Sequence, residues 1–131
     1  MSSDPRDQDF SWVEAREACS IAKVFLRLRR GVEADVETRN KQFASGRGPF
    51  AVVDGGERKF TVYRDTPEGP GQVVDFECRP REIRAAAKGG FDLRATLTVS
   101  LFGFCRLVVD GVEHEEWYFR KMALERLLFI D

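Results

Sequence analysis

The residues best suited to chemistry in this sequence lie in the stretch VVDGVEHEEWYF, residues 108–119. It contains the chain's one histidine, His114, next to Glu113, Glu115 and Glu116. Histidine and glutamate side chains transfer protons in enzymes, and together they can bind a metal ion. Neighbouring residues of a strand point to opposite faces, so at most two of these four can converge. The cluster therefore suggests His114 and Glu116 as acid–base candidates and predicts no metal site.

The cysteines offer a second kind of chemistry. Cys105 and His114 would form a nucleophile–base dyad only if strand pairing placed both on one face. No GxSxG or GxxxxGK(S/T) motif accompanies them, and no cofactor is implied. The three cysteines, Cys19, Cys78 and Cys105, are odd in number, widely spaced and without a CxxC pair. We therefore expect reduced thiols in a core.

The position of His114 depends on the Asp-Gly turn at residues 110–111. A two-residue type I′ turn places the histidine on the apolar face of the hairpin, together with Glu116. A three-residue turn with a β-bulge shifts the pairing by one residue, so the opposite set of side chains faces the core. His114 then points outward, and Trp117 and Phe119 are buried. The two-residue turn would bury the Glu116 carboxylate without a partner, which is costly. Burial therefore favours the bulge, although both registers remain open.

Length and composition indicate a single globular domain. The chain has 131 residues, of which 43% are hydrophobic and 33% charged, and its formal net charge is −1. A near-neutral chain of this kind argues against a nucleic-acid partner. Residues 1–10 are polar and acidic, which predicts a disordered tail before one domain over residues 11–131. With no signal peptide and no long apolar run, we expect a cytoplasmic protein without a membrane partner.

A long amphipathic helix is predicted at the start of the domain. Ser11 and Glu14 form a capping box, and apolar residues then recur at helical spacing. Gly31 can end this helix, or the helix can continue to about Gln42. Residues 32–39 fit either case, because they also alternate between apolar and charged residues as a strand would.

Strand signals begin after Pro49. Two short strands are expected around the Asp-Gly-Gly turn at residues 54–56, and a third over residues 73–79. Residues 80–90, PREIRAAAKGG, have the marks of a short helix, with proline in the first turn and glycines past the end. Residues 122–131 predict a short C-terminal helix.

The clearest pattern in the sequence is the alternation from Phe91 to Val109, where every odd position is apolar or glycine. One face of this segment is therefore expected to face the core. As a single strand it would be roughly 60 Å long, well beyond the size of a small domain. We expect it to bend or break at Gly103.

Together these elements predict an α+β fold. A long N-terminal helix packs on a strongly bent antiparallel sheet of five to six strands, and a short C-terminal helix follows. This order of elements is similar to that of the small dimeric chaperones of type III secretion. The similarity concerns topology, which by itself does not determine function.

The sequence has more apolar residues than one face of the sheet can bury, which indicates an interaction surface. Around residue 103 both faces of the strand become apolar, and such a surface needs cover from a partner. We therefore expect a non-enzymatic protein-interaction or chaperone-like module, binding a protein partner or itself as a homodimer. The expected partner-binding residues are Phe102, Phe104, Trp117 and Phe119.

A second hypothesis places a ligand cavity between the N-terminal helix and the curved sheet. Such a cavity could hold a small apolar ligand, or serve a simple acid–base enzyme, as in the architecturally similar cystatin-like and helix-grip folds. Its expected lining is Phe25, Leu93, Leu97 and Leu101. The catalytic candidates in that case are His114, Glu116 and Cys105.

Overall fold

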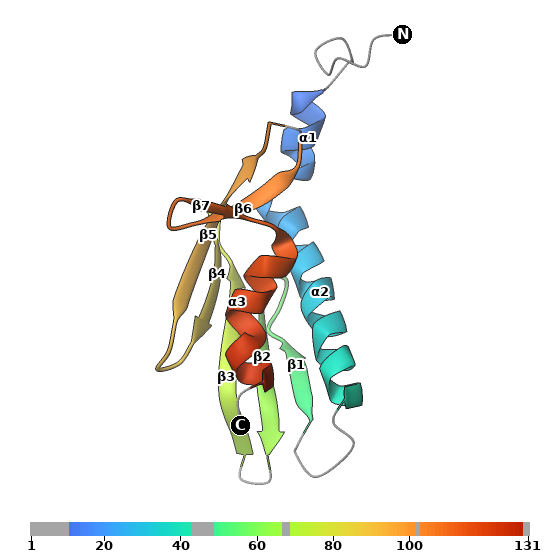
Figure 1. Cartoon of the computed structure of the whole chain (residues 1–131), viewed down its shortest axis with the longest axis vertical. Coiled ribbons are helices and arrows are strands. Elements are labelled where there is room, and N and C mark those ends of the chain that lie inside the picture. The colour runs from blue at the N-terminus through green and yellow to red at the C-terminus, as the bar shows by residue number, and fades with distance from the viewer. Residues whose placement is uncertain (1–10, 43–48, 67–68, 102, 130–131) are drawn as a thin grey trace.

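The computed structural model describes residues 11–42, 49–66, 69–101 and 103–129. The predicted tail at residues 1–10, Phe102 and the predicted helix end at residues 130–131 lie outside the described residues. The elements follow one another in this order (Figure 1): α1 (Trp12–Ala18), α2 (Ile21–Gln42), β1 (Phe50–Asp54), β2 (Lys59–Thr66), β3 (Gly69–Cys78), β4 (Ile83–Ala87), β5 (Asp92–Val99), β6 (Cys105–Val109), β7 (Val112–His114) and α3 (Glu116–Phe129). The predicted α+β class is confirmed.

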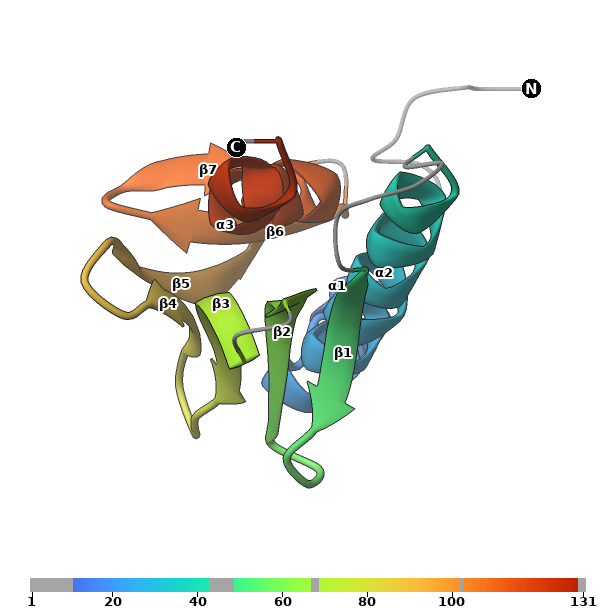
Figure 2. The same ribbon diagram turned by 90° about the horizontal axis from the view of Figure 1, so that it is seen from below.

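The strands form one antiparallel sheet in chain order from β1 to β7, and the sheet does not close on itself. Its bend lies at β5, whose first half pairs with β4 and whose second half pairs with β6. Seen from below, α3 lies inside the curl of the sheet and α2 lies beside β1 (Figure 2). The strongly bent sheet is confirmed, but within the described residues it has seven strands where five to six were expected.

The additional strand is β4, in the segment that was predicted to be a helix. Alanine favours helices, but only by a few tenths of a kcal/mol per residue, so tertiary pairing overrides it. β4 pairs with β3 on one side and β5 on the other, and Ile83 and Ala85 are buried. With a strand at this position, the order of elements no longer resembles that of the type III secretion chaperones.

The predicted N-terminal helix is divided into α1 and α2. The capping box is confirmed, because the Ser11 Oγ accepts a hydrogen bond of 3.2 Å from the Glu14 N–H. The helix breaks at Cys19, and a second cap starts α2, where the Ser20 Oγ accepts from the Lys23 N–H at 3.3 Å. The hydroxyl side chains thus satisfy backbone donors at both helix starts.

The alternative in which the helix continues past Gly31 is the one observed, since α2 ends at Gln42. Val32 and Val36 are buried on the same face of α2 as Phe25, so core packing offsets the low helix propensity of the glycine. Within the described segments, no helix is long and apolar enough to cross a membrane.

The long alternating segment breaks where the pattern predicted. β5 ends at Val99 and β6 begins at Cys105, and Gly103 between them has a φ of +85°. Leu97 pairs with Leu107 across the hairpin, so the odd positions of both strands share one face. That face contributes to the core, in which the rings of Phe60 and Phe76 stack with centroids 4.7 Å apart.

A disulfide joins Cys19, between α1 and α2, to Cys105 at the start of β6. The expectation of reduced thiols is therefore wrong for these two residues, which are 86 positions apart and meet only in the folded chain. Cys78 is a free, half-buried cysteine, and burial raises the pKa of its thiol. Disulfides persist mainly in oxidising compartments, so the cysteines no longer favour a reducing one.

The outer edge of β1 is covered by a side chain of α2. The Asn40 amide donates to the Phe50 carbonyl and accepts from the Phe50 N–H, both at 2.9 Å, as a neighbouring strand would. Replacing Asn40 with alanine removes both hydrogen bonds. We expect the free energy of unfolding in urea to fall by roughly 1–2 kcal/mol. The exposed Thr38→Ala change on the same helix should leave it within about 0.5 kcal/mol of the original, and equal effects of the two changes would contradict this role of Asn40.

Candidate functional site

The Asp-Gly hairpin has the two-residue register. Asp110 and Gly111 have φ angles of 51° and 78°, as a type I′ turn requires, and Leu107 pairs with His114. The favoured bulge is therefore wrong. Burial favours the bulge only if a strand continues to Phe119, whereas β7 ends at His114 and α3 begins two residues later.

The observed register places Cys105 and His114 on one face of the hairpin, but each catalytic candidate binds or contacts another group. The half-buried His114 ring stacks on the Tyr118 ring at a centroid distance of 5.1 Å. Glu116, at the start of α3, accepts hydrogen bonds from the Arg27 guanidinium, the shortest at 2.8 Å, which raises the pKa of Arg27. The sulfur of Cys105 belongs to the disulfide, so in this form it cannot act as a nucleophile. Each of the three candidates therefore has a structural partner.

The outer face of the sheet carries the densest set of charges. Arg84 donates two hydrogen bonds to Asp92, of 2.8 and 2.9 Å, and Arg79 pairs with Glu77. The Arg79 guanidinium lowers the pKa of Glu77, and the Arg84 guanidinium lowers the pKa of Asp92 to about 2. A general acid at neutral pH needs a raised pKa, so these carboxylates are suited to ion pairing. Among the residues that the structure describes, no group of three possible metal ligands is found.

The Asp92–Arg84 pair predicts a pH dependence of definite sign. The pKa of Asp92 is about 2 in the fold and 3.8 ordinarily, so its stabilising effect is complete above about pH 4 and disappears as the pH falls towards 2. At neutral pH we expect the melting temperature of the wild type to be slightly higher than that of Asp92→Asn. This difference should vanish near pH 2. Melting curves across this range test it, and added salt should shrink the difference. A difference independent of pH would contradict the pairing.

The expected cavity residues do not line a common space. Phe25 is buried and packs on Phe60 at a ring-centroid distance of 5.3 Å, and Leu93 and Leu97 are half-buried against the core. Leu101 is 90% exposed in the β5–β6 turn. The hollow that Phe25 borders, of about 440 Å³, contains none of the three leucines. It is lined by Ile21, Ala22, Phe25, Glu57, Arg58, Cys78, Arg79 and Pro80.

The expected partner-binding residues divide into two groups. Phe104 and Trp117 are 57% and 53% exposed. Phe119 is fully buried on the core side of α3, two positions after Trp117, so it is not available to a partner. The difference follows from the helix, in which residues two apart lie on different faces.

Phe104 and Trp117 are connected through two charged side chains. The Arg106 guanidinium lies over the Phe104 ring at 5.2 Å and pairs with Glu115 at 3.7 Å. Glu115 in turn accepts a hydrogen bond from the Trp117 indole N–H, and Tyr118 lies edge-on to that indole at 5.4 Å. Exposed aromatic and arginine side chains in contact are typical of binding hot spots.

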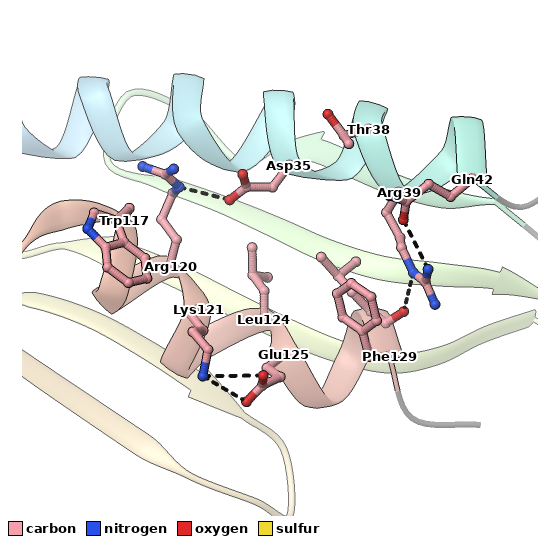
Figure 3. Close-up of a pocket in the computed structure, with 11 residues that line it drawn as sticks. Asp35, Thr38, Arg39, Gln42, Trp117, Arg120, Lys121, Leu124, Glu125 and Phe129 are labelled. Atoms are coloured by element: carbon pink, nitrogen blue, oxygen red, sulfur yellow. Dashed lines mark hydrogen bonds and ion pairs between the residues drawn. The ribbon is translucent and has the colours of Figure 1, made fainter.

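Trp117 also belongs to a groove of about 380 Å³ between α2 and α3 (Figure 3). Leu124 and Leu128 form an apolar floor and are almost fully buried. Trp117 lies at one end and Phe129, 59% exposed, at the other. The groove is lined by Asp35, Thr38, Arg39, Gln42, Trp117, Arg120, Lys121, Leu124, Glu125, Leu128 and Phe129.

Charged side chains near the Trp117 end are paired with one another. Arg120 on α3 donates to Asp35 on α2 at 2.8 Å, and Lys121 pairs with Glu125 at 3.3 Å (Figure 3). The arginine lies against Gly31, where a Cβ would come within 2.5 Å of the Arg120 Nη1. The glycine inside α2 therefore leaves room for the ion pair that joins the two helices.

The opposite end of the groove is built around Arg39. Its Nε donates to the Leu128 carbonyl at 2.8 Å, which satisfies an acceptor in the last turn of α3, and its Nη1 donates to Gln42 at 3.0 Å. The guanidinium also lies 3.9 Å from the centroid of the Phe129 ring, a cation–π contact. These contacts hold the aromatic ring at the rim.

The sequence does not predict this groove, because residues 32–39 fit both a helix and a strand and the C-terminal helix is expected only from residue 122. A signal was present, since Trp117, Lys121, Leu124 and Leu128 recur at helical spacing. The chain matches no protein-family model and shows no significant similarity to a curated protein or a solved structure, so the groove itself carries the functional argument.

Proposed function

We propose that this chain is a non-enzymatic protein-interaction module that binds an amphipathic helix of a partner protein in the α2–α3 groove. The observation that carries the proposal is a buried leucine floor between two half-exposed aromatic side chains, Trp117 and Phe129. Helix-in-groove recognition places one apolar stripe of the partner on a floor of this kind. Trp117 also belongs to the surface expected to bind a partner.

The dimensions of the groove suit a helix of about three turns. Trp117 and Phe129 are twelve positions apart on α3, which corresponds to about 18 Å. An extended peptide binds best by adding to the edge of a sheet, where backbone N–H and C=O groups are unpaired. Both walls of this groove are helices, whose backbone groups are bonded internally, so side chains must supply the contacts.

The charges of the groove favour binding over catalysis. Asp35 pairs with Arg120 and Glu125 with Lys121, so the charged side chains that line the groove already bind one another. Partner residues at the rim can add contacts that set orientation and association rate, while burial of the exposed Trp117 and Phe129 rings supplies most of the free energy of binding.

A displayed library of random peptides of about 16 residues, long enough to span the groove as a helix, tests the proposal. We expect peptides selected on the wild type to share apolar residues at helical spacing. Trp117→Asp and Phe129→Asp should each weaken their binding roughly 30-fold. Val53→Asp is the matched control, because Val53 is 46% exposed on β1 and does not line the groove.

The proposal fails if no peptide is selected, or if the selected peptides bind both groove variants as tightly as the wild type. It also fails if the selected peptides carry no amphipathic pattern, since they would then not bind the groove as helices. Circular dichroism of each variant confirms that the fold is retained.

A further inference from the structure

We infer that a second copy of this chain docks on the end of the molecule formed by α1 and the β5–β6 turn. Among the residues that the structure describes at this end, four large apolar side chains are exposed: Trp12 at 68%, Val13 at 57%, Leu101 at 90% and Phe104 at 57%. We refer to them as the α1–turn surface. The inference goes beyond the groove, since none of the four lines it.

The disulfide brings the two halves of this surface together. Trp12, Ala15 and Cys19 recur at helical spacing, so Trp12 lies on the face of α1 that leads to Cys105. Phe104 directly precedes Cys105, and α1 contacts both β5 and β6. Figure 1 shows α1 beside the β5–β6 turn, at the opposite end of the molecule from the end of α3.

The described residues of the turn are joined by hydrogen bonds. The Ser100 N–H donates to the Phe104 carbonyl at 2.7 Å, and the Gly103 N–H donates to the Ser100 carbonyl at 2.9 Å. The Ser100 Oγ also accepts from the Phe104 N–H at 3.1 Å. Leu101 directly follows the hydrogen-bonded Ser100 and is 90% exposed.

The helix itself lacks cover. α1 has seven residues and none of them is buried, and a helix of this length is not stable alone in water. Its covalent anchor is Cys19, at its C-terminal end, which leaves Trp12 and Val13 projecting at the other. A second copy packed on this end would bury both residues.

The exposed area is sufficient for a weak twofold interface. The four side chains expose roughly 500 Å² per copy, so a twofold contact through them would bury roughly 1,000 Å² in total. That is near the lower limit for a specific protein interface, and flanking residues would add to it.

The charges around this surface favour another copy over a lipid surface. Glu14 and Arg16 on α1 carry opposite charges, whereas Glu17 pairs with Lys23 and Arg106 with Glu115 within one copy. A twofold axis allows the acidic groups of one copy to face the basic groups of the other. An anionic membrane attracts clusters of lysine and arginine, and the mixed charges of α1, Glu14, Arg16 and Glu17, form no such cluster.

Light scattering after size exclusion, over a series of protein concentrations, tests the inference. We expect the wild type to shift from monomer to dimer, and Leu101→Asp and Trp12→Asp each to remain monomeric with unchanged melting temperature. Val53→Asp, a change of the same kind on β1, should dimerise as the wild type does. The two surface variants lie on different elements, so agreement between them locates the contact.

A wild type that stays monomeric throughout, or a dimer that persists in Leu101→Asp, would overturn the inference. So would a monomer that cosediments with vesicles of phosphatidylcholine and phosphatidylglycerol, because the surface would then bind lipid. The groove is tested separately. Trp117→Asp should still dimerise, and Leu101→Asp should still bind the selected peptides.

Discussion

Reduction of the Cys19–Cys105 disulfide is expected to lower the free energy of unfolding by about 4 kcal/mol. The bond closes a loop between residues 86 positions apart, and a cross-link of this span strongly restricts the unfolded chain. Unfolding in guanidinium with and without a phosphine reductant measures the effect, and Cys19→Ser should reproduce it without reductant. Faster amide exchange in α1 should accompany the loss, because the helix has no buried residue to hold it.

The third cysteine provides the control for this experiment. Cys78→Ser removes the free, half-buried thiol and leaves the disulfide intact. In this variant the reductant should have the same effect as in the wild type. An unchanged unfolding midpoint after reduction of the wild type would show that the disulfide does not stabilise the fold.

Phe119→Ala is expected to lower the free energy of unfolding by roughly 3–5 kcal/mol, because it opens a cavity in a fully buried site. Trp117→Ala, two residues earlier, should lower it by less than about 1 kcal/mol, since more than half of that side chain is exposed. Urea unfolding of the two variants measures the contrast. Their binding to the selected peptides should show the reverse order, once both are compared under conditions in which they are folded.

A large loss of stability in Trp117→Ala would contradict the groove, because it would place the indole in the core. A small loss in Phe119→Ala would contradict the packing of α3 inside the curl of the sheet. The pair of measurements therefore separates the structural face of α3 from the face that lines the groove.

The sheet was largely predictable because its patterns are local. The alternation from Phe91 to Val109 predicts two strands whose odd-numbered residues share one face, and Gly103 marks the break between them. The capping box at Ser11 was equally local, since it needs only a hydroxyl and the backbone three residues on. Such features depend on neighbours in the sequence, and the structure confirms them.

Features that depend on distant partners were not predictable. The alanines of β4 form a strand only because β3 and β5 lie on either side of them. The disulfide needs α1 and β6 to be adjacent, which no cysteine spacing reveals. For the same reason the groove was missed, because it exists only where α2 and α3 meet.

The turn register at Asp110 and Gly111 shows how one wrong element affects a site. Placing Trp117 and Phe119 on a strand made the bulge favourable and turned His114 outward. Because α3 begins at Glu116, the helix separates the two aromatic residues, and the two-residue turn buries no unpaired carboxylate. The expected partner-binding role then applies to Trp117 and not to Phe119.

The most direct test of the groove is the nuclear magnetic resonance signal of the two indole N–H groups on addition of a selected peptide. The chain has two tryptophans, Trp117 in the groove and Trp12 on the α1–turn surface, so each indole reports on one surface. We predict that the Trp117 indole signal shifts together with amides of α2 and α3, while the Trp12 signal stays in place. A shift of the Trp12 signal alone, or of neither signal, would contradict the proposal that the α2–α3 groove binds a partner helix.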